Sequence, residues 1–515
     1  MNGRTCWTIA GLAAGVALGQ LTATACTGMY AGRKVTVDGT MMYARTIDLA
    51  PTEGVSRLER VARGTRYNNR YSYVCTPYVE TLGHAFGAAA AVNERGLVLS
   101  GTVTAYVTAK MRELDPYVHT KISVGEKNLS AMVAGDCATA REAIAYCGRK
   151  IAECGYDSSD IYIFADTNET WMLEALTGHE WAALKVPDDK IAVFGNEFMI
   201  REYDLNDKEN VIYSPGLLAL AKKAGGIVWI DEKKGIMDLY ETYSKDYRDG
   251  PHYRTYFGHR MLAPSTAGAY DPKKPYPLFF DPEPGTKIAL TNFFAVMRTR
   301  YEGVNCPEEN LDVKIRTIGT TSQHSSHVVQ LRYDLPERYR GTIWYAPSKA
   351  QYSVYLPLNG SIESLVEEFS RDQTEGPYRY DPQIAGMEFE RLYALARMRE
   401  YVFTNATCKV DLRPYYGAGI RAYWEAKERA WTADWNDRLT RAAATDDAKG
   451  LTDYSVSLQR GALADVRQMF DELVWYACHN VRISGDGGGA TDVPKEPYVP
   501  FRRRQADWKA GVVVP

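Results

Sequence analysis

Beyond its first 21 residues, the sequence contains no apolar run that approaches the roughly 18 residues needed to span a bilayer. It also lacks a P-loop, an EF-hand loop, a dinucleotide-binding fingerprint and an internal repeat. The net charge is only −3, so no excess of positive charge points to a nucleic-acid partner. The sequence therefore predicts a mature protein without a membrane span, soluble or at most attached to a surface, that does not bind nucleic acid.

Spacings typical of metal ligands are missing as well. None of the nine cysteines forms a CxxC pair or combines with histidine in a zinc-site pattern. We therefore expect no metal ion and no other cofactor. Seven cysteines remain when Cys6 and Cys26 are set aside, and because seven is odd, at least one is free or intermolecular. The sequence leaves their pairing open.

The N-terminal segment has the features of an export signal. Arg4 precedes an apolar segment of small residues at positions 9–21, and residues 23–25 read Ala-Thr-Ala, the A-x-A pattern of signal peptidase cleavage. Cleavage after this pattern would remove residues 1–25 and leave Cys26 as the first residue. We therefore expect an exported protein that resides in the periplasm, at the cell surface or outside the cell. Whether signal peptidase or self-cleavage exposes Cys26 is open.

A chain that begins with Cys26 would carry a thiol and a free α-amino group on one residue. A thiolate is a nucleophile, and the pKa of a free cysteine is near ~8.5. An α-amine titrates at about 7.7–8.0, so near neutral pH part of it can accept the thiol proton. Cys26 is therefore a candidate nucleophile. The alternatives are a signal peptide that ends at a cysteine by chance, and a lipoprotein cysteine, for which position −3 is usually Leu rather than Ala23.

Residues 34–45 read as a hairpin, with strands on either side of an Asp-Gly turn at residues 38–39. Such a hairpin would return Arg45 and Asp48 towards Cys26. A guanidinium beside a thiol favours the thiolate, and a carboxylate could hold the α-amine. A surface pair of arginine and aspartate is the alternative interpretation.

These residues resemble the start of a known enzyme family. The order Cys-Thr, Asp-Gly and Ala-Arg-x-x-Asp is similar to the opening of secreted dipeptidases of the N-terminal-nucleophile (Ntn) hydrolase superfamily. Bile salt hydrolases and penicillin V acylases are more distant relatives. A Val-Asn-Glu-x-Gly turn at residues 92–96 and a Ser-His-Val-x-Gln-Leu strand at 326–331 extend the resemblance. It implies that Cys26 is the nucleophile, Arg45 the charged neighbour of the thiol, and Asp48 the group that binds the α-amine.

The resemblance implies further residues of the site. The family's oxyanion-hole asparagine falls on Asn196, at the end of an apolar strand. Relatives commonly show Thr-Arg-Arg-x-x-Arg where this chain has Thr-Tyr-Phe-Gly-His-Arg at residues 255–260. Arg260 is retained and Arg254 is shifted, so both are candidates for binding the substrate. The second oxyanion donor is left open between a backbone N–H and Thr102.

The expected fold class is α+β, and the resemblance implies a four-layer αββα Ntn-hydrolase sandwich with a helical C-terminal extension. Strand and turn patterns dominate up to about residue 360, with one long helix expected at residues 129–154. From about residue 381, apolar residues recur at the three- and four-residue intervals typical of helices. We expect a signal peptide over residues 1–25, a catalytic domain over 26–375, a helical part over 376–484 and an irregular tail over 485–515.

The expected function is that of an exported cysteine dipeptidase, which attacks small peptides with Cys26 and proceeds through a thioester. One alternative is an N-acyl amide hydrolase of the penicillin V acylase or bile salt hydrolase type. A second alternative is a surface lipoprotein that binds peptides without cleaving them. The dipeptides accepted and the oligomeric state are left open.

Overall fold

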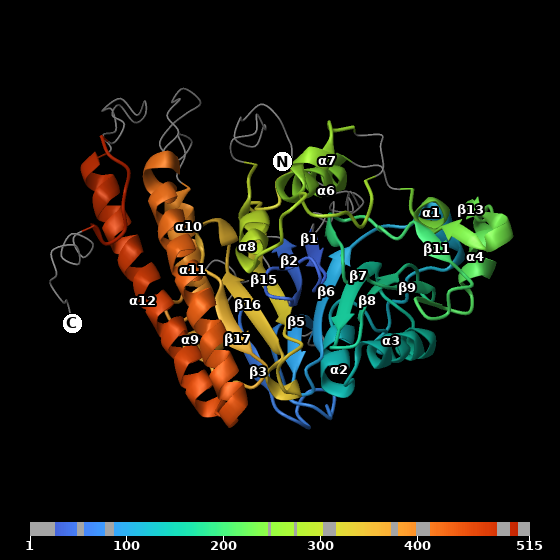
Figure 1. Cartoon of the computed structure of the whole chain (residues 1–515), viewed down its shortest axis with the longest axis horizontal. Coiled ribbons are helices and arrows are strands. Elements are labelled where there is room, and N and C mark those ends of the chain that lie inside the picture. Colours follow the sequence, from blue (N-terminus) through green and yellow to red (C-terminus); the bar gives the residue numbers. More distant parts are fainter. Residues whose placement is uncertain are drawn as a thin grey trace, which may run out of the picture.

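The computed structural model describes residues 26–48, 56–77, 87–245, 249–271, 276–301, 316–371, 380–397, 413–480 and 495–502. The predicted signal peptide lies outside these residues, as does most of the predicted tail. The fold is α+β, with mainly antiparallel sheets flanked by helices (Figure 1).

One sheet has six strands, and Cys26, the candidate nucleophile, directly precedes its second strand. Each strand of this sheet is antiparallel to its neighbours. In spatial order the strands are β10 (Ile191–Phe194), β1 (Thr27–Ala31), β2 (Met41–Asp48), β15 (Gln323–Leu331), β16 (Gly341–Pro347) and β17 (Leu356–Asn359).

The second large sheet has eight strands. In spatial order they are β12 (Val211–Tyr213), β9 (Trp181–Lys185), β8 (Thr170–Ala175), β7 (Asp160–Ala165), β6 (Val98–Thr104), β5 (Ala88–Asn93), β4 (Tyr73–Pro77) and β3 (Glu59–Val61). A small third sheet contains β11 (Glu202–Asp204), β14 (Ile236–Asp238) and β13 (Trp229–Asp231).

The two large sheets contact each other, and helices contact both of them. Strands β2 and β15 contact β6, and β15 and β16 contact β5. Val92 and Val98 of one sheet belong to the same buried cluster as Tyr43 and Val329 of the other. Helices α2 (Leu129–Asp136) and α3 (Ala140–Cys154) contact the eight-stranded sheet, and α6 (Asp249–Leu262) and α8 (Leu290–Arg298) contact the six-stranded sheet.

Shorter helices connect these layers. They are α1 (Ala109–Leu114), α4 (Leu217–Ala224), α5 (Leu239–Tyr243), α7 (Pro264–Ala267) and α9 (Glu367–Ser370). Within the described residues, 3₁₀ helices cover Glu232–Lys234, Glu337–Tyr339 and Ala350–Tyr352.

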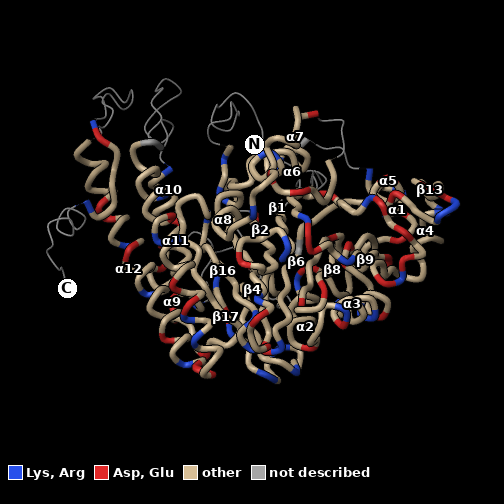
Figure 2. Tube along the Cα trace, viewed as in Figure 1, with Lys and Arg blue, Asp and Glu red and all other residues tan. Residues whose placement is uncertain are grey.

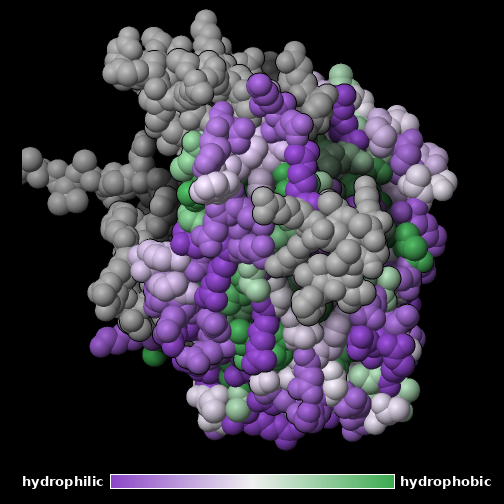
Figure 3. All heavy atoms as spheres, turned by 90° about the vertical axis from the view of Figure 1, so that its left-hand side faces the viewer, coloured by the Kyte–Doolittle hydropathy of each residue, from purple (hydrophilic) through white to green (hydrophobic). Residues whose placement is uncertain are grey.

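The C-terminal part of the described chain contains helices α10 (Ala385–Ala396), α11 (Arg413–Thr445) and α12 (Ala448–Asn480). They lie along the β16–β17 edge of the six-stranded sheet (Figure 1). Trp424 and Leu458 join the same buried cluster as Leu356. Figure 3 looks at this side of the molecule, and its surface is mainly hydrophilic with smaller hydrophobic areas. The predicted boundary after residue 375 falls outside the described residues.

Two expectations about local structure are wrong. The first strand of the predicted hairpin is not at residues 34–37, because residues 32–40 form turns and bends while β1 lies earlier. Burial decides this: every residue of β1 is buried between two partner strands, whereas Val37 is 65% exposed. The predicted helix at residues 129–154 is interrupted at Cys137, where Thr139 caps a new helix by accepting a 3.2 Å hydrogen bond from the N–H of Glu142.

Candidate active site

Cys26 stands immediately before β1, which lies between β10 and β2. In the register of β1 and β2, Gly28 lies opposite Arg45. A Cβ atom on Gly28 would be 2.6 Å from the ring of Phe194 and 2.6 Å from the hydroxyl of Tyr43. Only glycine fits there, so close packing fixes the strand that carries the nucleophile candidate.

Arg45 and Cys26 are in direct contact, and both are buried. Nη2 of Arg45 lies 3.0 Å from Sγ of Cys26 and 3.5 Å from Oε1 of Glu126, while Nη1 donates to the carbonyl oxygen of Gly101. Burial raises the pKa of the Cys26 thiol. The charge of Arg45 opposes this rise in pKa, whereas the charges of Asp48 and Glu126 add to it. The charge of Arg45 therefore favours the thiolate form of Cys26.

Arg254 ties the nucleophile candidate to Asn196. From helix α6, its Nη1 donates to the backbone oxygen of Cys26 and, over 3.1 Å, to Oγ1 of Thr27; Nη2 donates to Oδ1 of Asn196 over 2.8 Å. The side chain is 1% exposed, and burial lowers the pKa of Arg254 to about 10, so it remains charged at neutral pH. Because these contacts are with Cys26, Thr27 and Asn196, they give Arg254 a part in positioning the residues of the site.

The close approach of α6 to the sheet depends on a glycine. A Cβ atom on Gly195 would lie 2.7 Å from Cα of Pro251 at the start of the helix. A larger residue would push α6 outwards. Gly195 thereby lets Arg254 reach the residues at the end of β10.

Asn196 bridges the two large sheets at this end. Its Nδ2 donates a 2.8 Å hydrogen bond to the carbonyl oxygen of Thr104 at the end of β6. The pairing of β6 with β7 shifts register between Gly101 and Val103, which marks a β-bulge. Bulges re-aim backbone groups and are frequent beside active sites. The bulge lies next to Arg45, because that side chain binds the Gly101 carbonyl.

Asp48 is buried at the end of β2, and one of its oxygens is held by an arginine. Oδ2 lies 3.0 Å from Nη2 of Arg316. Oδ1 is buried and has no hydrogen-bond partner within the described residues. Burial raises the pKa of Asp48, and the charges of Arg316 and Arg254 counter this rise. Oδ1 of Asp48 can therefore accept a hydrogen bond from a cation.

Arg260 lies apart from this cluster. It is exposed on α6, and its Nη1 is 3.3 Å from the hydroxyl of Tyr256. No contact recorded between described residues joins it to Cys26. The structure thus brings Cys26, Arg45, Asp48, Asn196 and Arg254 together and leaves Arg260 outside, so its part in substrate binding stays a prediction.

Comparison with known proteins places the chain in a family. Residues 25–378 match the family described as Peptidase family C69. This chain belongs to that family. The membership confirms the resemblance drawn from the sequence and the prediction that the protein is a peptidase enzyme.

Several relatives of this C69 chain are named as dipeptidases. A probable dipeptidase B of Streptococcus pyogenes serotype M1 is 28% identical, with 68% of this chain and 75% of the relative covered. A probable dipeptidase of Salmonella dublin is 27% identical over 66% of this chain and 82% of the relative. Among solved structures, variant R18L of conjugated bile acid hydrolase from Clostridium perfringens matches with 10% identity and a TM-score of 0.31, covering 69% of this chain and 97% of that one.

Two charged residues of the C69 chain's site were not predicted from its sequence. Glu126 lies before α2, where it pairs with Arg45, and Arg316 pairs with Asp48. Neither residue belongs to a recognisable motif, and each is far in sequence from its partner. These two residues can be recognised only in the three-dimensional structure, because only the packing of the sheets brings their segments to the end of β2.

A buried acid–histidine pair anchors the segment that follows Asn196. Oε2 of Glu197 lies 3.1 Å from Nδ1 of His252, and Oε1 accepts a 3.2 Å hydrogen bond from Thr255. Glu197 and His252 are both almost fully buried. They fasten α6 to the end of β10 beside the Arg254 contacts.

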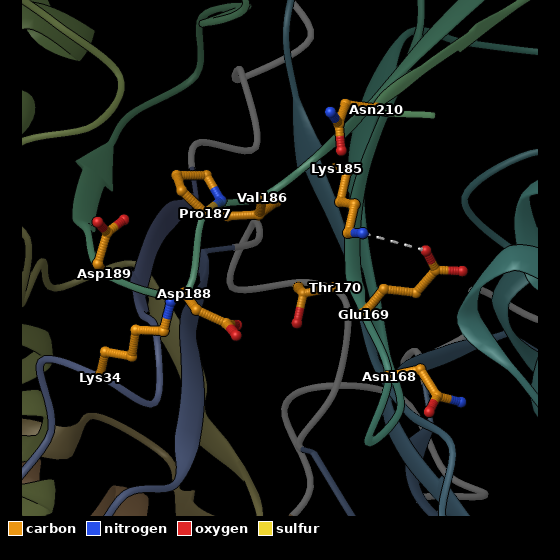
Figure 4. A pocket seen from close by; sticks show the side chains of 10 residues that line it. All are labelled: Lys34, Asn168, Glu169, Thr170, Lys185, Val186, Pro187, Asp188, Asp189 and Asn210. Atoms are coloured by element: carbon orange, nitrogen blue, oxygen red, sulfur yellow. Dashed lines mark ion pairs between the residues drawn. The ribbon is translucent and has the colours of Figure 1, made fainter. Parts of the chain in front are cut away.

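A cavity of about 520 Å³ lies near the end of β1 that is remote from Cys26, where the hydroxyl of Tyr30 donates to the carbonyl oxygen of the lining residue Pro187. Figure 4 shows the lining side chains. Figure 4 shows Lys185 pointing towards Glu169, and Nζ and Oε2 are 3.8 Å apart. The lining contains neither Cys26 nor a residue in contact with it. The lining residues are Lys34, Asn168, Glu169, Thr170, Lys185, Val186, Pro187, Asp188, Asp189 and Asn210.

Within the described residues, no group of three or more His, Cys, Asp or Glu side chains could hold a metal ion. None of the helices in that part of the chain combines the length and apolarity of a membrane span.

Proposed function

We propose that this chain is an exported cysteine dipeptidase that cleaves small peptides with Cys26 as the N-terminal residue of the mature protein. Membership of a peptidase family and the dipeptidase names of the relatives support the substrate class. The observation that carries the proposal is the buried 3.0 Å contact between Arg45 and the Cys26 sulfur. A buried thiol beside a guanidinium can become a nucleophile without a histidine.

The proposed architecture is the four-layer αββα sandwich of Ntn hydrolases. Helices α2 and α3 would be one outer layer and α6 and α8 the other, with the two large sheets between them. The contacts of each helix pair with one sheet, and of the sheets with each other, support this arrangement.

In the first step of the proposed mechanism, the α-amine of Cys26 accepts the thiol proton. The thiolate then attacks the peptide carbonyl carbon, and a C–S bond forms. Asp48 holds the α-amine through its available oxygen. Arg45 stabilises the thiolate. Collapse of the tetrahedral intermediate breaks the C–N bond, and the α-amine returns its proton to the departing amine.

The intermediate places negative charge on the former carbonyl oxygen. Asn196 and a backbone N–H of the Gly101–Val103 bulge would stabilise this oxyanion. A single donor of this type typically contributes about 2.7–4 kcal/mol to the transition state. Water, activated by the same α-amine, then hydrolyses the thioester and frees Cys26.

Export is proposed from the sequence features of residues 1–25. The family match begins at residue 25, directly before Cys26, which supports a mature chain that starts there. The compartment follows from export: the periplasm, the cell surface or the exterior.

The test is to express the chain from residue 1, determine the mature N-terminus by mass spectrometry and assay dipeptide hydrolysis. We expect a free amine on Cys26, and at least a thousandfold loss of activity in Cys26→Ala, as for other nucleophiles. Cys154→Ala, which removes a half-buried cysteine elsewhere, should retain activity. A diacylated Cys26, or turnover of N-acyl amino acids but not dipeptides, would overturn the proposal.

A further inference from the structure

Arg316 brings a positive charge to the buried carboxylate of Asp48. Nη2 of Arg316 lies 3.0 Å from Oδ2 of Asp48, and the two side chains are 30% and 1% exposed. The other oxygen of Asp48, Oδ1, is buried and has no hydrogen-bond partner within the part of the chain that the structure describes. The arginine therefore holds one oxygen of the carboxylate and leaves the second for another donor.

Cys26 lies beside the same carboxylate. In the pairing of β1 with β2, Thr27 is opposite Thr46, so the next step along both strands brings Cys26 to the level of Ile47 and next to Asp48. The backbone N–H of Asp48 donates a hydrogen bond to the Cys26 sulfur, which lowers the pKa of the thiol. A free α-amine on Cys26 therefore begins next to Asp48, whose Oδ1 is the kind of acceptor that an ammonium group requires.

The backbone of Arg316 is held by a strained residue. Tyr301 donates a 3.2 Å hydrogen bond from its hydroxyl to the backbone oxygen of Arg316. Its φ is +64°, a left-handed conformation that is unfavourable for a bulky residue and persists only where the surrounding contacts enforce it. Tyr301 is 2% exposed and stacks on Phe257 of α6, with 4.0 Å between the ring centroids. Arg316 is therefore fixed to the helix that also carries Arg254.

Two arginines act on the charge of Asp48. Burial raises the pKa of Asp48, and Arg316 opposes this rise through its charge and its hydrogen bond, followed by the charge of Arg254. The guanidinium of Arg254 donates to the backbone oxygen of Cys26 and to Asn196. Arg316 is therefore the arginine whose contact with the carboxylate itself is defined by a short distance.

Other titratable groups lie nearby. Arg45 and Glu126 act with opposite signs on the Cys26 thiol. His324 lies at the bulge in the pairing of β15 with β2, next to the residue that is opposite Asp48. Positive and negative side chains are interspersed along the chain (Figure 2). The local contacts, and not a field of one sign, therefore determine the charge of this site.

We propose that Arg316 is a positioning residue of the dipeptidase, which orients the carboxylate of Asp48 so that Oδ1 holds the α-amine of Cys26. This inference rests on the proposed function and adds to it a residue that acts through Asp48. Without the positive charge of Arg316, Asp48 and the α-amine together would bind their proton more tightly. The amine would then become available as a base only at higher pH.

The experiment measures kcat/KM for Ala-Ala as a function of pH in the wild type, Arg316→Gln and Arg316→Lys. Arg316→Gln should lower kcat/KM at pH 7 about 10- to 100-fold, the range for a hydrogen bond to a charged group. It should also move the acidic limb of the profile up by about one pH unit or more. Arg316→Lys keeps the charge and should shift the limb less. An acidic limb that stays in place in Arg316→Gln would overturn the inference.

The matched control is Arg141→Gln. Arg141 also binds a largely buried carboxylate, that of Glu169, at 2.7 Å, and the two side chains are 44% and 11% exposed. This pair is not in contact with the site, so kcat/KM and the acidic limb should stay as in the wild type. If Arg141→Gln shifts the limb as far as Arg316→Gln does, the shift is a general effect of lost charge and the inference fails.

Two further variants show through which group Arg316 acts. Asp48→Asn combined with Arg316→Gln should be little worse than Asp48→Asn alone, because the arginine acts through Asp48. In a His324→Gln background, Arg316→Gln should still move the acidic limb. Additive losses with Asp48→Asn, or a shift that disappears with His324→Gln, would contradict the proposed role.

A readout that needs no substrate separates this inference from the proposed function. The rate of reductive methylation of the Cys26 α-amine, followed by mass spectrometry against pH, should require a higher pH in Arg316→Gln. If the wild type does not cleave Ala-Ala but the amine shows this shift, the dipeptidase function fails and the positioning of the amine stands. Cleavage of Ala-Ala without the shift would overturn the inference alone. If Arg316→Gln does not fold, Arg316→Lys is measured instead, with a smaller shift expected in the same direction.

Discussion

The guanidinium of Arg254 donates a 2.8 Å hydrogen bond to the side-chain oxygen of Asn196. Arginine can only donate, so this contact determines which end of the amide is oxygen. The nitrogen then faces the carbonyl of Thr104, which can only accept, at 2.8 Å. Both neighbours therefore demand the same orientation of Asn196.

Loss of Arg254 should impair the chemical step. Arg254→Gln removes the guanidinium group that hydrogen-bonds to both Cys26 and Asn196. We expect kcat to fall about 10²- to 10³-fold, as when an oxyanion donor is removed. Asn196→Ala should give a similar loss, and the double variant should be little worse than either, because the two side chains act as one unit. Steady-state kinetics on one dipeptide measures all three.

The matched control for that series is Arg33→Gln. Arg33 also binds an acceptor, Asp188, at 2.9 Å, but its side chain is 40% exposed and remote from Cys26. Activity within a factor of about two of wild type is expected there. Additive losses in the Arg254 and Asn196 double variant would contradict a shared role.

Arg45 should set the pH dependence of thiol reactivity. Its charge lowers the pKa of the Cys26 thiol, which burial raises. Arg45→Gln should therefore raise the thiol pKa, so that reactivity falls at neutral pH and recovers only at higher pH. Arg45→Lys keeps the charge and should show a smaller shift. The rate of iodoacetamide alkylation as a function of pH measures the effect, and a pH profile that does not move in Arg45→Gln would contradict it.

Glu174 should make the folded protein less stable at alkaline pH. Its carboxyl is fully buried in β8 and accepts hydrogen bonds from the N–H groups of Met199 and Ile200, and burial raises its pKa to about 8. An unfolded glutamate titrates near ~4.3. The folded state thus holds a proton that the unfolded state releases, so this contribution is full below about pH 4.3 and is lost as pH rises through about 8.

The measurement is the change in Tm between pH 6 and pH 8.5. Glu174→Gln keeps an acceptor for both N–H groups but cannot ionise, so the decrease in Tm should be smaller than in the wild type. An equal decrease in both proteins would show that Glu174 does not contribute.

The C-terminal helices should not be separable from the sheets without loss of stability. Arg298 of α8 and Glu428 of α11 form a buried double contact, with N–O distances of 2.9 and 2.7 Å, and each side chain is 2% exposed. Removal of Glu428 leaves the buried Arg298 with only a longer, 3.8 Å ion pair to the more exposed Glu425, at a cost of up to about 3–5 kcal/mol. Glu428→Leu should therefore lower the free energy of unfolding by about this amount in urea titrations.

Restoring neutrality is the control. Arg298→Met combined with Glu428→Leu should recover most of the loss, because no charge is left buried alone. Asp434→Ala, which breaks the exposed pair with Arg438 on α11, should cost no more than about 0.5 kcal/mol. A double variant as unstable as Glu428→Leu would argue that packing, and not the charge, is decisive.

Much of the strand pattern could be predicted because short-range signals determine it. The strands at residues 160–165 and 170–175 are β7 and β8, and each borders a polar turn. The sequence pattern places the first strand too late, because the Asp-Gly signal at residues 38–39 outweighs the burial of Thr27–Ala31, which depends in part on β10, a partner distant in sequence. Local pattern carries no information about such partners.

The same distinction applies to the site. Cys26, Arg45 and Asp48 stand together on neighbouring strands, so their proximity followed from a short segment. Glu126 and Arg316 join them from segments about 80 and 270 residues away, counted along the sequence. Nothing local distinguishes them from surface charges, because their role arises only where the two sheets meet.

The central position of β1 bears on how the protein matures. Cys26 is 1% exposed, and the strand that follows it pairs with a neighbouring strand along each edge. A processing enzyme needs an extended, accessible segment around the bond it cuts. For a mature chain that starts at Cys26 and is processed by a separate enzyme, removal of the leader therefore has to come before the sheet closes around this strand, so that secretion and folding are coupled in time.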